Sequence, residues 1–137
     1  FIQDETILFK IKSILKNKTL VSKIENLYGL NNATEITKYS DLVMIDRGDL
    51  LAEVGTNKLY DSINKISENA VNFKKPLIMA TENLESMQTR LQPSKSEIIA
   101  LEHSIILGTN IIMLSDETAT SHLFLNTLDW LNNFLQN

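Results

Sequence analysis

Four short segments rich in apolar residues recur along the chain, and each is followed by polar or charged residues. They cover residues 19–23, 42–45, 77–80 and 110–114. Continuous apolar segments of this length, flanked by helical patterns, are typical of buried strands in a parallel sheet. We therefore predict four parallel strands at these positions.

The segments between them carry apolar residues three and four positions apart, which is the period of an amphipathic helix. The predicted helices cover residues 5–16, 33–39, 58–72, 95–107 and 122–135. Ser94 and Glu97 have the spacing of a capping box at the start of the fourth helix, and Gly108 is a typical C-terminal cap. A loop is predicted at residues 29–32, and an irregular passage between residues 49 and 56.

Helices and strands that alternate in this way predict an α/β fold with a parallel sheet. A complete (β/α)8 barrel needs about 250 residues, whereas this chain has 137. We therefore expect residues 1–137 to form one domain that is about half of such a barrel. Because the first residue is Phe1 rather than methionine, we expect the segment to be cut from a longer chain. The near-equal strand spacing also occurs in ankyrin and tetratricopeptide repeats, but their signature residues are missing.

Composition narrows the class of protein. The hydrophobic content of 43% favours a globular chain. The net charge of −4, with acidic and basic residues interleaved, gives no indication of a nucleic-acid or membrane partner. The chain has no cysteine, which excludes disulfides and thiolate metal sites.

Charged residues at the ends of the first two predicted strands indicate a site. Side chains alternate along a strand, so Lys23 and Glu25 point to the same side, and Asp49 follows the next strand. Carboxylates suit Mg²⁺ and a lysine suits phosphate. The alternative is a purely structural salt bridge between Lys23 and Glu25.

Four blocks of sequence, in the expected order, resemble the pyruvate kinase family. The blocks are Ser22–Asn26, Ser40–Leu50, Ala80–Met87 and Met113–Ala119. The resemblance covers nearly the whole chain, but only the second half of that family's catalytic barrel. It implies a TIM (β/α)8 barrel of pyruvate-kinase type, of which this chain holds about the C-terminal half.

The resemblance also implies an activity: transfer of a phosphoryl group from phosphoenolpyruvate to ADP in glycolysis, followed by protonation of the enolate to give pyruvate. Glu25 and Asp49 match the family's ligands for Mg²⁺ or Mn²⁺, and Lys23 matches its catalytic lysine. Backbone N–H groups around Gly48 and Asp49 would hold the substrate carboxylate. Thr81 matches the threonine beside the carbon that receives the proton, with a simple capping hydroxyl as the alternative.

Further expectations follow from the family. The ligands of its K⁺ ion and its nucleotide lid domain lie outside this segment, so we expect the isolated segment to be inactive. The full-length protein is expected to bind phosphoenolpyruvate, pyruvate, ADP and ATP, to form a homo-oligomer (a tetramer by resemblance), and to lie in the cytoplasm or in an organelle such as a plastid.

The sequence departs from the family at several positions. Asp46 stands where a small residue, usually alanine, is expected, and Leu51 replaces a glycine. Glu82 replaces a glutamine, Asp116 a glycine and Ala100 an aspartate. Three of these changes add an acid, and each acid that points into the site would weaken binding of an anionic substrate by about 2 kcal/mol at ~8 Å and an effective dielectric constant of ~20.

The remaining polar residues receive structural interpretations. Arg47 is expected to pair with neighbouring carboxylates rather than with substrate. Glu85 and Glu117 are expected to support the site or the fold. His103 and His122 have no metal-ligand partner at useful spacing and are expected at the surface.

Two other functions stay open. The first is a catalytically dead pyruvate-kinase-like barrel with a structural or regulatory role, which the added acids favour; a coupled assay for pyruvate on the full-length protein separates it from the enzyme. The second is a Mg²⁺-dependent aldolase or lyase that forms an enolate, which would be active without ADP.

Overall fold

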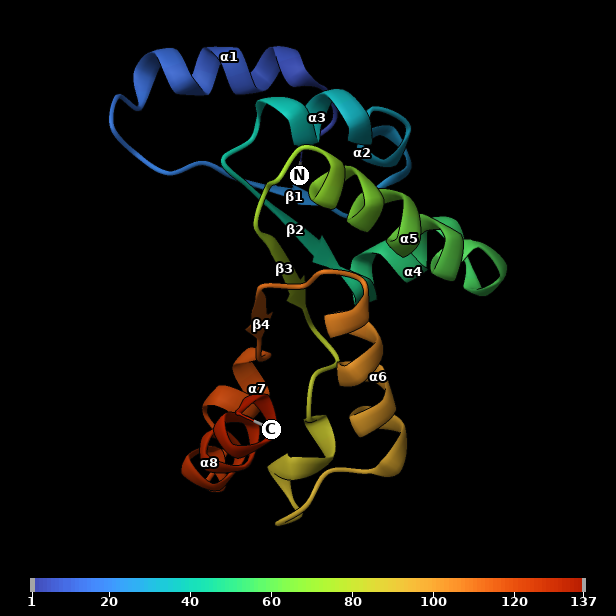
Figure 1. The fold of residues 1–137 in the computed structure, drawn as a ribbon, viewed down its shortest axis with the longest axis vertical. Helices are drawn as coiled ribbons and strands as arrows, with labels where there is room; N and C mark the ends of the chain where they lie inside the picture. Colours follow the sequence, from blue (N-terminus) through green and yellow to red (C-terminus); the bar gives the residue numbers. More distant parts are fainter. Residues whose placement is uncertain (1, 137) are drawn as a thin grey trace.

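The computed structural model describes residues 2–136 and contains one parallel sheet of four strands (Figure 1). The strands are β1 (Val21–Ile24), β2 (Leu42–Asp46), β3 (Leu77–Ala80) and β4 (Ile111–Met113). They lie side by side in the order β1-β2-β3-β4, and every neighbouring pair is parallel. The prediction of an α/β fold with a partial parallel barrel is confirmed, and the repeat alternative is wrong.

Helices connect the strands and cover one side of the sheet (Figure 1). They are α1 (Glu5–Ile14), α2 (Leu27–Asn31), α3 (Ala33–Tyr39), α4 (Arg47–Val54), α5 (Thr56–Asn72), α6 (Lys95–Ile106), α7 (Asp116–Ala119) and α8 (Phe124–Leu135), with a short 3-10 helix, η1 (Glu85–Gln88). Figure 1 shows α1 to α5 gathered around β1 and β2, whereas α7, α8 and η1 lie together at the opposite end of the molecule.

The larger core lies between the sheet and the helices α1 to α5. Alternate strand residues point into it because side chains change sides at every position along a strand. Ile24, Ile45 and Met79 come from three adjacent strands, and Ile36 and Ile66 come from α3 and α5. A second, smaller core joins η1, α6 and α8 through Leu84, Met87, Leu101 and Leu131.

The opposite face of the sheet is largely uncovered in the described part of the chain. It carries Val21, Ile111 and Met113, whose exposed fractions are 40%, 43% and 42%. Within residues 2–136, β1 and β4 each pair with only one other strand. An apolar face between two unpaired strand edges is what a sheet that closes into a larger barrel would show.

Predicted features at the ends of α6 are confirmed. The Ser94 side chain accepts from the Glu97 N–H at 3.3 Å, and the Glu97 carboxylate accepts from the Ser94 N–H at 2.7 Å, which is a complete capping box. Gly108 follows the helix with φ +89°, a conformation that glycine adopts at little cost. A side chain there would also collide with Val71, because its Cβ would lie 2.8 Å from a Val71 methyl group.

Two predicted irregular segments are helical instead. Residues 29–32 were expected to form a loop, but Leu27–Asn31 is α2, because the Asn26 side chain accepts the Gly29 N–H at 2.8 Å and caps it. The irregular passage expected between residues 49 and 56 is wrong as well. Asp46 caps α4 by accepting the Asp49 N–H at 3.3 Å, which starts a helix immediately after β2. The short α7 and η1 were not predicted either.

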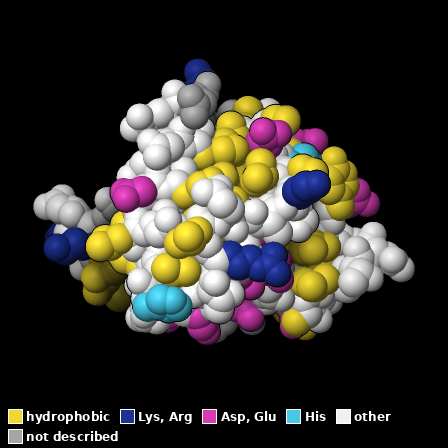
Figure 2. All heavy atoms as spheres, turned by 90° about the horizontal axis from the view of Figure 1, so that it is seen from below, with side chains coloured by type: hydrophobic (Ala, Val, Ile, Leu, Met, Phe, Trp, Pro, Cys, Tyr) yellow, Lys and Arg dark blue, Asp and Glu magenta, His cyan; other side chains and the backbone are white. Residues whose placement is uncertain are grey.

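The surface carries small hydrophobic patches with charged groups between them. Figure 2 shows this pattern on the face seen from below. Among the described helices, none combines the length and apolar character needed to cross a bilayer.

We predict that residues 1–137 by themselves self-associate in solution through the uncovered sheet face. Light scattering after size exclusion should show species larger than the monomer that increase with concentration. A Val21→Lys, Met113→Lys double variant should shift this distribution toward monomer, because charges placed on this apolar face oppose its burial against another copy.

Val71→Lys is the matched control, since Val71 is 58% exposed but lies on α5 rather than on the sheet. Strictly monomeric behaviour of the parent at all concentrations, or equal loss of association in the control, would contradict the role of the sheet face.

Candidate functional site

The candidate site lies where the parallel strands end. Glu25 follows β1 directly, and Asp46 is the last residue of β2. Asp49 lies in the first turn of α4, and Thr81 follows β3. Because all four strands run in the same direction, their carboxyl ends meet at one edge of the sheet, the edge that carries active sites in (β/α) barrels.

Lys23 is the centre of this site. Its Nζ lies 2.6 Å from Glu25 Oε2, 3.0 Å from Asp46 Oδ2 and 3.5 Å from Asp49 Oδ2. Partial burial alone would lower the pKa of Lys23, but the bonds to Glu25 and Asp46 outweigh it and raise the pKa above its ordinary value. Lys23 is therefore a protonated, anchored cation at neutral pH.

Asp46 is held by contacts from three directions. Its Oδ2 pairs with Lys23, while its Oδ1 accepts from the Asp49 N–H at 3.3 Å and from the Thr81 hydroxyl at 3.1 Å. Burial by itself would raise the pKa of Asp46. The Lys23 ammonium and the Asp49 N–H outweigh this effect and hold the pKa below its ordinary value. Asp46 is thus a buried, ionised carboxylate.

Three carboxylates gather closely enough to share one cation. One oxygen each from Glu25, Asp46 and Asp49 lies within 4.8 Å of the others. The Glu25 side chain is 2% exposed and that of Asp49 is 59% exposed, so the cluster runs from the protein interior to its surface. Carboxylate oxygens are the ligands that Mg²⁺ and similar hard cations prefer, so the residues present fit a divalent ion.

Arg47 links the strand ends behind this cluster through hydrogen bonds. Its guanidinium donates to the Thr81 carbonyl oxygen and, at 2.7 Å, to Asn83 Oδ1. Asn83 in turn donates to the carbonyl oxygens of Met79 at 3.0 Å and Met113 at 2.8 Å. Arg47 thus has the structural role that was expected, although its printed hydrogen bonds go to carbonyl and amide oxygens rather than to carboxylates. Burial lowers the pKa of Arg47, and the negative charges of nearby acids oppose this change.

In the structure the Thr81 hydroxyl caps a backbone N–H group of α4, which is the alternative role considered for this residue. Its hydroxyl oxygen accepts from the Gly48 N–H, at the start of α4, at 3.2 Å. Thr81, Glu82 and Leu84 have φ values of +61°, +52° and +60°, an unusual cluster of left-handed residues without glycine. Such backbone strain often gathers at functional sites, and it aims the Thr81 side chain at α4 and Asp46.

Gly48 is not required by the fold as described. A Cβ at this position would meet Asp46 Oδ1 at 3.7 Å and Thr81 Oγ1 at 3.8 Å, which are ordinary contacts. Crowding by the neighbouring side chains therefore does not explain the glycine at this position.

Of the acids that depart from the family, only Asp46 belongs to the cluster. Glu82 and Asp116 have exposed side chains and lie outside the cluster. Leu51 on α4 and Ala100 on α6 are half-buried. Glu85 and Glu117, which were expected to support the site or the fold, are also exposed.

The two histidines differ in how exposed they are. His122 is exposed as expected, whereas His103 is half-buried and stacks on Tyr60 with ring centroids 5.5 Å apart. Asn83, which connects Arg47 to β3 and β4, was not among the predicted site residues. The available signal was a polar residue three positions after the end of an apolar strand.

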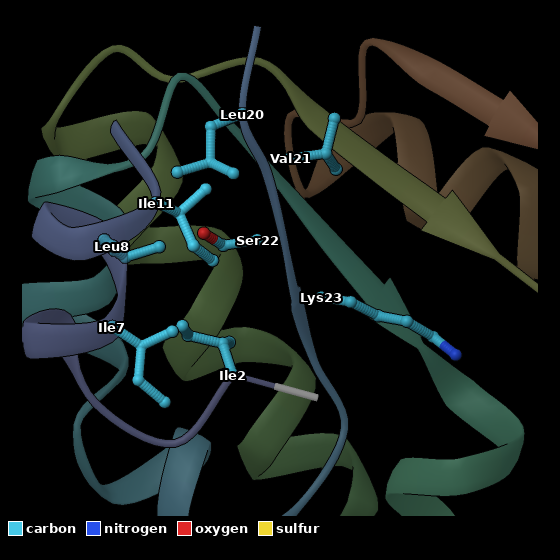
Figure 3. Close-up of a pocket in the computed structure, with 8 residues that line it drawn as sticks. All are labelled: Ile2, Ile7, Leu8, Ile11, Leu20, Val21, Ser22 and Lys23. Carbon is cyan, nitrogen blue, oxygen red and sulfur yellow. The ribbon is translucent and has the colours of Figure 1, made fainter. Parts of the chain in front are cut away.

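A separate apolar pocket lies between α1 and β1 and is distinct from the charged cluster. Figure 3 shows side chains of α1, among them Leu8 and Ile11, facing Leu20, whereas the Lys23 side chain extends away from them. Lys23 is the residue that this pocket shares with the charged cluster.

A lysine among carboxylates at the strand ends of a (β/α) segment defines the class of this chain: part of a (β/α) barrel with a charged cluster at the edge where such barrels carry their active sites. The family described as "Pyruvate kinase, barrel domain" matches residues 1–127. The chain belongs to the pyruvate kinase family.

Individual relatives agree with this assignment. The chain is 36% identical to a pyruvate kinase of Dictyostelium discoideum over 115 residues, which cover 81% of this chain and 23% of the relative. It is 31% identical to a pyruvate kinase of Candida albicans over 137 residues, which cover 97% of this chain and 27% of the relative. The chain thus spans about a quarter of the length of these relatives.

The fold agrees as well. The crystal structure of Cryptosporidium parvum pyruvate kinase matches with a TM-score of 0.90 at 26% sequence identity, over 98% of this chain and 30% of that one. The similarity therefore extends over nearly all of the four-stranded sheet and its helices.

We predict that Arg47→Met lowers the free energy of unfolding by about 1–3 kcal/mol, because it leaves the buried oxygens of Thr81 and Asn83 without their donor. Arg90→Met, which removes an exposed arginine, is the matched control and should change stability little. Urea unfolding followed by circular dichroism measures both. Equal midpoints for the two variants would show that Arg47 does not fasten the strand ends.

Proposed function

We propose that the protein to which this chain belongs is a pyruvate kinase, and that these residues supply its metal-binding and lysine part of the active site. It would transfer a phosphoryl group from phosphoenolpyruvate to ADP and protonate the resulting enolate to give pyruvate. The observation that carries the proposal is the meeting of Lys23, Glu25 and Asp49 at the carboxyl end of a pyruvate-kinase-family sheet.

Glu25 and Asp49 would hold one Mg²⁺ or Mn²⁺, and their oxygen donors within 4.8 Å of each other support this assignment. A divalent ion bound there would offset negative charge on the substrate oxygens. Asp46 belongs to the same cluster, although the resemblance assigns it no metal. Membership of the family implies a general dependence on a divalent metal ion and on K⁺, with K⁺ ligands outside these residues.

Lys23 would stabilise charge on the phosphoryl group in transit. Its side chain is 33% exposed at the strand ends, and the carboxylates around it keep it protonated. A fixed cation needs no reorganisation when charge shifts toward it, and this is how preorganised groups lower a barrier.

Gly48, Asp49 and Thr81 would position the substrate. The N–H groups of Gly48 and Asp49 lie in the first turn of α4, where backbone donors and the helix dipole favour a carboxylate. The Thr81 hydroxyl borders the same space, because it contacts the Gly48 N–H at 3.2 Å. From there Thr81 would lie beside the carbon that takes up the proton.

The wider context follows from the family. We propose phosphoenolpyruvate, pyruvate, ADP and ATP as ligands of the complete protein, a homotetramer as its assembly and the cytoplasm as its location. The inactivity of residues 1–137 by themselves stays a prediction, since the sheet forms only half of an eight-stranded barrel.

We predict that Glu25→Gln and Asp49→Asn each weaken Mn²⁺ binding by the complete protein at least ~10-fold. Each variant keeps the shape and an oxygen of the side chain but removes the charge that a divalent ion requires. Electron paramagnetic resonance of free Mn²⁺ during titration measures the affinity directly.

Asp41→Asn is the matched control, since Asp41 pairs with Lys12 at 2.9 Å and lies outside the carboxylate cluster. If Glu25→Gln and Asp49→Asn bind Mn²⁺ like the parent, the carboxylates around Lys23 are structural and the proposed catalytic role fails.

A further inference from the structure

Two of the groups proposed to position a substrate carboxylate, the Asp49 N–H and the Thr81 hydroxyl, already lie beside a carboxylate of the protein itself. The Asp49 N–H donates to Asp46 Oδ1 at 3.3 Å, and the Thr81 hydroxyl lies within hydrogen-bond distance of the same oxygen, at 3.1 Å. The Lys23 ammonium lies 3.0 Å from Asp46 Oδ2. Groups from β1, α4 and the residue after β3 therefore converge on one side chain.

We propose that Asp46 is a resident carboxylate that competes with an acidic substrate for this position, an inference that rests on the proposed function. A small carboxylic acid binds fully only when Asp46 releases these donors. Asp46 thereby lowers the affinity of the site for acids and restricts which acids enter it.

The local geometry supports competition rather than coexistence. The Asp46 side chain is only 11% exposed, so its charge is shielded little by water. A second carboxylate at the same donors would lie within a few ångströms of it, where like charges in a partly buried site repel strongly. Each donor is also limited: the Thr81 hydroxyl has one proton, which it directs either to Asp46 or to the Ala80 carbonyl oxygen at 2.7 Å.

Asp46 has a structural role that the competition does not remove. It caps α4, so its release requires the first turn of α4 to exchange one acceptor for another. An incoming carboxylate offers the same kind of acceptor to the Asp49 N–H, so the exchange keeps that donor satisfied.

The test is binding of oxalate, a small dicarboxylate, to the complete protein at saturating Mn²⁺, measured by isothermal titration calorimetry. Asp46→Ala should bind oxalate at least ~10-fold more tightly than the parent. Asp46→Asn, which retains an oxygen that can cap α4 but carries no charge, should show a smaller gain. Because Asp46→Asn keeps the cap on α4, its oxalate affinity still tests the inference if Asp46→Ala fails to fold.

Asp116→Ala is the matched control, since Asp116 is also an acid that departs from the family but is exposed and outside the cluster. It should bind oxalate like the parent. Equal or weaker oxalate binding by both Asp46 variants, with Mn²⁺ affinity intact, would overturn the inference and leave the proposed metal site standing. Failure of the parent to bind Mn²⁺ would instead count against the proposed function itself.

Discussion

The ion pairs of Lys23 are the interaction on which the site depends. One ammonium group contacts carboxylates from the end of β1, the end of β2 and the first turn of α4. Without that cation, three negative charges would lie within 4.8 Å of one another around a side chain as buried as Glu25. A buried charge is tolerated only when it is paired, so Lys23 and its carboxylates must assemble together.

The parallel sheet makes this assembly possible. Pairing places Lys23 opposite Met44 and Asp46 opposite Ala80, so side chains from three strands reach the same edge of the sheet. Arg47 and Asn83 then join that edge to β3 and β4 through carbonyl oxygens. The site is therefore built on strand ends and one helix start, which hold geometry more accurately than a loop does.

The strands could be predicted from the sequence because their apolar segments are continuous and sharply bounded. Residues 77–80 were predicted at the bounds that β3 has, since Pro76 and Thr81 flank a fully apolar segment. The meeting of Lys23 and Glu25 also followed from alternation alone. Both features depend only on neighbours in the chain.

What could not be predicted depends on partners distant in sequence or on a single cap. The Asp46 carboxylate caps the start of α4, but in the sequence Asp46 is recognisable only as a polar residue at the end of a strand. Arg47 finds Asn83, 36 residues away, instead of a nearby acid. The left-handed backbone conformation of Thr81 could not be predicted, because glycine is the residue that usually indicates such a conformation and none is present there.

The central claim is that Glu25 and Asp49 form a metal site beside Lys23. Anomalous diffraction from crystals of the complete protein grown with Mn²⁺ tests it most directly. The account predicts one manganese peak within bonding distance of both carboxylates, with the Lys23 ammonium displaced from at least one of them. A map without manganese between Glu25 and Asp49, with Lys23 still bridging them, would contradict it.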